Sequence, residues 1–156
     1  MSAERLQKWA LIAEIVGGLA VIITLVFLIF EIRENSAVIR SSSYGQYTEL
    51  LNDWRLEGSS NPEIARLWRI YADGNLNSLN EVESQQLQFF ATSLWGIYEA
   101  SYFAYEYGVL GVSEWDRLKT VACSQYRVAQ PHDFWQRLKR FITPEFAAYI
   151  ETDCRQ

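Results

Sequence analysis

The sequence predicts an all-α protein, in which a long N-terminal transmembrane helix continues into a small helical-bundle domain. The chain opens with an apolar run from Leu11 to Phe30 in which Glu14 is the only charged residue. Further along, apolar side chains recur every three or four residues, which is the period of an amphipathic helix. No segment alternates apolar and polar residues for long enough to predict a strand.

Composition supports one folded domain beside this helix. The 156-residue chain is 15% aromatic, which indicates a packed core rather than a disordered tail. Its net charge is −5, and it has no stripe of basic residues. This balance argues against nucleic acid as a partner.

The apolar run has the length of a membrane anchor. At about 1.5 Å per residue, roughly 20 helical residues cross the ~30 Å hydrocarbon core of a bilayer. Trp9 stands where an interfacial aromatic residue belongs. The run is about twice as long as the apolar part of a signal peptide, and no small-residue cleavage site follows it. We therefore expect a polar tail at residues 1–8 and an uncleaved transmembrane helix at residues 9–32.

The residues after the anchor also have helical periodicity. Tyr44, Tyr47, Leu51 and Trp54 are spaced to share one helical face. We expect the helix to continue as a juxtamembrane extension over residues 33–57 and to stop at Gly58. Residues 58–156 are then the all-helical soluble domain.

Start and stop signals divide this domain into five expected helices. Asparagine, serine and threonine act as N-caps, proline favours the first turn, and glycine ends helices. The signals are Asn61, Pro62 and Gly74 for the first helix, Ser78, Glu81 and Gly108 for the second, Ser113 and Asp116 for the third, Pro131 for the fourth, and Thr143 and Pro144 for the fifth.

Several segments together resemble a known group. They are Ile12–Ser36, Asn61–Arg69, Phe134–Trp135 and Thr143–Phe146. They resemble a widespread group of bacterial single-pass membrane proteins of unknown function. The resemblance implies a bacterial inner-membrane protein, and it carries no catalytic residue across to this chain.

Candidates for catalysis are few. His132 is the single histidine, and no nucleophile is positioned beside it by the sequence. Glu99, Tyr102 and Glu106 share a helical face and could form a ligand-binding or acid–base site. The alternative is that arginines pair with the two carboxylates in a structural role. The helices carry no Glu-x-x-His pairs for a metal centre, so we expect a non-catalytic protein without metal or cofactor.

The two cysteines, Cys123 and Cys154, do not have metal-ligand spacing. In an oxidising compartment they could form a disulfide that closes a loop of about 30 residues. Two unrelated buried thiols are the alternative.

The anchor itself carries the most specific signal. Small side chains recur at spacings of three and four residues and form one face. Such faces let membrane helices approach closely, so we expect a homo-oligomer. The face consists of Ala10, Ala13, Gly17, Ala20 and Thr24.

Two acidic residues lie near the ends of the anchor. A carboxylate that faces lipid is costly, so Glu14 should turn toward a helix bundle or the interface. Rings of Glu14 and Glu31 around a central pore could conduct cations. The plainer alternative is that both residues serve as polar positions within a tight bundle.

Charges beside the anchor bear on its orientation. Arg5 and Lys8 precede it, whereas Arg33 and Arg40 follow it. Counting the α-amino group, the N-terminal side of the anchor has one positive charge more than the other side. Because positive charges favour the cytoplasmic side, this difference slightly favours a cytoplasmic N-terminus and a periplasmic domain. The expected function is a membrane-anchored scaffold; the alternatives are the cation pore and a site near Tyr102.

Overall fold

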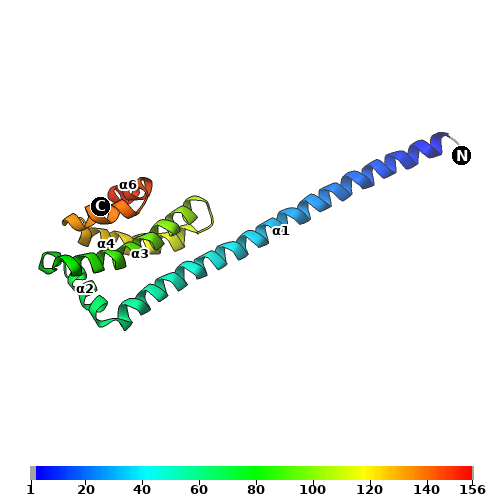
Figure 1. The fold of residues 1–156 in the computed structure, drawn as a ribbon. Helices are drawn as coiled ribbons and strands as arrows, with labels where there is room; N and C mark the ends of the chain where they lie inside the picture. The colour runs from blue at the N-terminus through cyan, green and yellow to red at the C-terminus, as the bar shows by residue number, and fades with distance from the viewer. Residues whose placement is uncertain (1–2, 156) are drawn as a thin grey trace. The chain divides into compact units, whose positions relative to one another are not determined.

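All regular secondary structure in the described part of the protein is helical. A computed structural model describes the backbone of residues 3–155 and the side chains of residues 7–155, and this part contains no strand (Figure 1). This confirms the all-α prediction. The helices are α1 (Ala3–Ser60), α2 (Pro62–Ala72), α3 (Glu81–Glu106), α4 (Val112–Ala129), α5 (Asp133–Leu138) and α6 (Pro144–Asp153), with 3₁₀ turns η1 (Leu76–Ser78) and η2 (Lys139–Phe141).

The chain divides into two compact units, Met1–Ile39 and Arg40–Gln156. The first is the N-terminal part of α1, which is long and apolar enough to cross a membrane. Its large hydrophobic side chains from Trp9 to Ile32 are 47–68% exposed. Within the described residues of this unit, these side chains form no core.

The second unit begins earlier than the sequence suggested. The sequence predicts that residues 33–57 are an extension outside the soluble domain, whereas the compact unit starts at Arg40. Leu51 is buried, and Tyr44, Tyr47 and Trp54 pack against the same core. The C-terminal part of α1 is thus the first helix of the domain, because its apolar face is needed to complete that core.

Gly58 does not end α1, which continues to Ser60. A Cβ atom at Gly58 would lie 2.8 Å from Cζ of Phe90. The Phe90 ring stacks on Trp54, with 4.4 Å between ring centroids. The glycine therefore permits a close approach between α1 and α3 rather than a turn of the chain.

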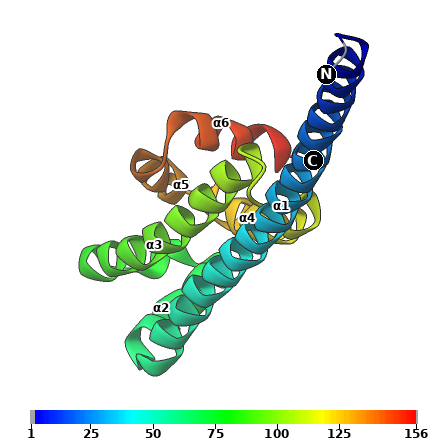
Figure 2. The same cartoon turned by 90° about the vertical axis from the view of Figure 1, so that its right-hand side faces the viewer.

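α3 packs against α2, α4 and α5, and Figure 2 shows α3 running past α4 and α5. Three tryptophans, Trp95, Trp115 and Trp135, are each only 1% exposed. Burial of such large rings supplies much of the free energy that holds a small helical domain together.

Several predicted helix ends are confirmed. The Asn61 side chain accepts the backbone N–H groups of Glu63 and Ile64, and Thr143 caps α6. Gly74 and Gly108 both have φ of +70° just after helices α2 and α3. This left-handed conformation costs glycine little, which explains why both helices end there.

Other predicted helix starts are wrong by a few residues. The capping box of α3 is formed by Asn80 and Glu83, because Ser78 lies within the preceding 3₁₀ turn. α4 begins at Val112, with Gly111 at the N-cap position. Ser113 therefore lies inside the helix, and the expected box of Ser113 and Asp116 does not form. α5 begins at Asp133, after Pro131 and His132.

Candidate functional site

The small-residue face of the first unit is open. Ala10, Ala13, Gly17, Ala20 and Thr24 are all exposed. The Thr24 hydroxyl donates to the backbone oxygen of Ala20 at 2.9 Å, so its polar group is satisfied within the helix. A Cβ atom at Gly17 or Gly18 would meet no described atom within 4 Å beyond the neighbouring helix backbone. Within the described residues of the first unit, no side chain covers this face.

The two acidic residues of the anchor are also exposed. Among the side chains of residues 7–155, none forms a hydrogen bond or ion pair with Glu14 or Glu31. Their roles in a pore or a bundle remain predictions.

The proposed site of Glu99, Tyr102 and Glu106 is largely a packing feature. Tyr102 is 6% exposed, and its ring centroid lies 4.7 Å from that of Tyr149. Burial raises the pKa of Tyr102 above its usual value, and the nearby Glu106 carboxylate adds to this. Glu99 accepts the backbone N–H of Thr143, whereas Glu106 is exposed.

Glu99 and Tyr102 do not share the cavity that Glu106 borders, which has a volume of about 470 Å³. Within residues 7–155, no arginine forms an ion pair with Glu99 or Glu106, so the predicted structural pairing is not present there either. The same residues hold no group of three histidine, cysteine, aspartate or glutamate side chains placed to bind a metal.

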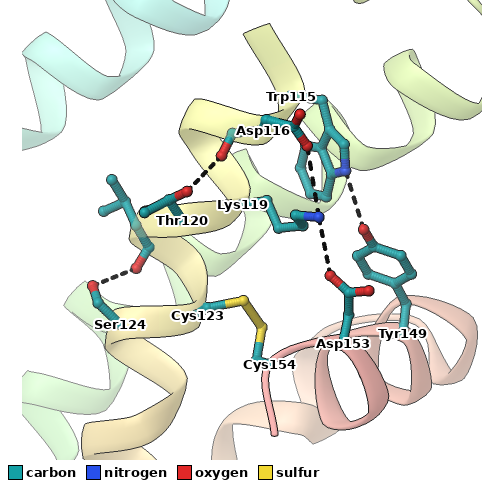
Figure 3. The surroundings of a disulfide bond; sticks show 10 residues. Trp115, Asp116, Lys119, Thr120, Cys123, Ser124, Tyr149, Asp153 and Cys154 are labelled. Carbon is teal, nitrogen blue, oxygen red and sulfur yellow. Dashed lines mark hydrogen bonds and ion pairs between the residues drawn. A yellow bond between two sulfur atoms is a disulfide. The ribbon is translucent and has the colours of Figure 1, made fainter. Parts of the chain in front are cut away.

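Cys123 and Cys154 form a disulfide between α4 and the C-terminal end of α6 (Figure 3). Both residues are buried, at 8% and 1% exposure. Sequence spacing left the bond open, because only the docking of α6 on α4 brings the Cα atoms to 5.0 Å.

Polar contacts surround the disulfide and tie the same two helices together. Lys119 lies between two carboxylates, 3.1 Å from Asp153 and 3.6 Å from Asp116 (Figure 3). One turn away, the indole N–H of Trp115 donates to the Tyr149 hydroxyl at 3.2 Å. The hydrogen bond with Asp153 is the main reason that the pKa of Lys119 is raised. α6 is therefore held along its length rather than at one point.

Glu151 adds a further contact to α6. It accepts the indole N–H of Trp135 at 2.8 Å and lies 3.2 Å from Nζ of Lys139. The Trp135 hydrogen bond, helped by Lys139, holds the pKa of Glu151 below its usual value. The carboxylate form thus stabilises the junction of α5, η2 and α6.

Sequence reasoning missed a cavity of about 580 Å³ that is lined by residues of η1, α3 and α5. Its polar lining includes Ser84 and Arg137, which are separated by 53 residues. No local spacing connects these positions, so periodicity could not have identified them.

Comparisons of the chain with protein-family models, curated proteins and solved structures give no match.

Proposed function

We propose that this chain is a single-pass membrane protein that associates with copies of itself and presents its C-terminal domain as a non-catalytic interaction module. The exposed apolar surface of residues 9–32 is the observation that carries the proposal. Full burial of one large apolar side chain is worth about 1.5–3 kcal/mol. Leaving the whole run in water would cost on the order of tens of kcal/mol, which a bilayer avoids.

The small-residue face supports association between copies. Lipid tails are as apolar as leucine, so helices in a bilayer associate by close packing rather than by the hydrophobic effect. Gly17, near the middle of the face, leaves open space where a side chain would stand. Packing of this face against a second copy would also move the neighbouring Glu14 away from lipid, where a carboxylate is costly.

We further propose a bacterial inner membrane, with the domain in the periplasm. The Cys123–Cys154 disulfide supports an oxidising compartment. The basic residues Arg5 and Lys8 before the anchor agree with a cytoplasmic N-terminus. The resemblance to bacterial single-pass proteins supports the same assignment.

Association is tested by counting subunits of the full chain in lipid nanodiscs, for the natural protein and for two matched variants. Gly17→Leu places a bulky side chain on the small-residue face. Gly18→Leu makes the same change one residue later, about 100° around the helix. A Cβ atom added at either position meets no described atom within 4 Å beyond its own stretch of helix, so we attribute an effect of either substitution to contacts between copies.

We expect Gly17→Leu to lower the association constant by about tenfold or more, which equals about 1.4 kcal/mol, and Gly18→Leu to leave it nearly unchanged. A natural protein that is monomeric in lipid, or two variants that behave alike, would refute the proposal. The subunit count also tests the cation pore of Glu14 and Glu31, because a dimer leaves no room for a central channel.

A further inference from the structure

A polar cavity of about 580 Å³ opens in the C-terminal domain, between η1, the first turns of α3 and α5. Phe134 and Leu76 give it two buried apolar contacts. Side-chain amides, among them Asn77, Gln85 and Gln88, supply much of the remaining lining. This volume is in the range of small-molecule sites, and the amides can both donate and accept hydrogen bonds.

The guanidinium of Arg137 is the cationic group of this cavity. Its Nη2 donates to the Ser84 hydroxyl at 3.1 Å, and its Cζ atom lies 5.6 Å from the centre of the Phe134 ring. Its Nε is buried and has no hydrogen-bond partner within the described residues. Leaving a buried donor unpaired is unfavourable, so an acceptor that reaches this nitrogen would be favoured.

Arg137 also forms no ion pair with the nearby acidic residue of its own helix, Asp133. Asp133 stands one turn earlier on α5, a spacing at which opposite charges often pair. Even so, no ion pair joins Asp133 and Arg137 among residues 7–155. A neutral hydroxyl and an aromatic ring orient the guanidinium instead, so its positive charge remains available to an incoming oxyanion.

The other charges of the lining restrict the ligand. Glu81 and Asp133 border the same cavity. These two carboxylates would repel a doubly charged phosphate. A ligand with one carboxylate and one cationic amine suits the lining better, because its carboxylate matches the Arg137 guanidinium and its amine matches the two acidic side chains. We propose that this cavity binds a small zwitterion of the amino-acid class. The ligand carboxylate pairs with Arg137, and its ammonium group pairs with Glu81 or Asp133.

The test uses the full chain in nanodiscs and isothermal titration calorimetry with each of the twenty L-amino acids. Any amino acid that binds is compared with its carboxamide, which lacks the carboxylate, and with inorganic phosphate. We expect at least one of the twenty amino acids to bind with a Kd in the micromolar to low millimolar range. We expect the carboxamide and phosphate to bind at least tenfold more weakly.

Arg137→Gln should weaken binding about 10- to 100-fold, the usual effect of losing a charged hydrogen bond. Arg140→Gln, which removes an exposed arginine three residues later, should leave the affinity unchanged. If Arg137→Gln does not fold, Ser84→Ala serves as the second variant, because it removes only the hydroxyl that orients the guanidinium. We expect Ser84→Ala to lower the affinity for the amino acid several-fold. The proposal is overturned if no amino acid binds below about 10 mM, if the carboxamide binds equally well, or if the folded variants bind like the natural protein.

Discussion

Replacing Cys123 and Cys154 together by alanine removes the covalent link between α4 and α6. The bond joins positions separated by 31 residues. In the chain-entropy model, a loop of that length stabilises the folded state by about 3–4 kcal/mol. For a domain of roughly 120 residues, the entropy of unfolding is about 0.25 kcal/mol/K, so the melting temperature should fall by about 12–16 °C.

The melting temperature is followed by tryptophan fluorescence of the full chain in detergent. Three buried tryptophans of the domain report on its core. Ser124→Ala, an exposed change beside Cys123, is the control and should shift stability by less than about 0.5 kcal/mol. A double-alanine variant that melts within about 3 °C of the natural protein would refute the role assigned to the disulfide.

The same pair of cysteines tests the orientation of the domain. Alkylation of intact cells under denaturing conditions, followed by a gel-shift measurement, should find both thiols blocked by the disulfide. Fully reactive thiols in cells would contradict a periplasmic domain, because the periplasm keeps such bonds oxidised.

Two further predictions concern packing and charge. Gly58→Ala should destabilise the protein by about 1 kcal/mol, because crowding against Phe90 outweighs the helix preference of alanine. Gly45→Ala, which meets no atom within 4 Å, should instead stabilise it by up to about 1 kcal/mol; urea unfolding distinguishes the two signs. The lowered pKa of Glu151 adds stability that is present above about pH 4.5 and is lost as the pH falls through the folded-state value. Glu151→Gln should therefore lower the melting temperature at pH 7 and reduce its fall between pH 7 and pH 3.5, and an unchanged acid sensitivity would contradict this contact.

Helical periodicity and capping chemistry are local, and they predicted most of the fold. Asn61, Thr143, Gly74 and Gly108 each mark a helix end at the residue where the structure has it. At the start of α3, where the prediction was wrong by two residues, two signals competed. Ser78 and Asn80 are both acceptable N-caps, and the packing of buried Leu76 in a 3₁₀ turn favours the later one.

The sequence by itself therefore determined the all-α class, the long apolar helix and its small-residue face, because these depend on residues within a few turns of one another. Tertiary structure alone decided that the domain begins at Arg40, that Gly58 admits Phe90, and that α6 docks where Cys154 meets Cys123. It also brought Arg137 beside Ser84. These contacts join residues tens of positions apart, and their geometry follows from how the large aromatic side chains of the core fill the space between helices.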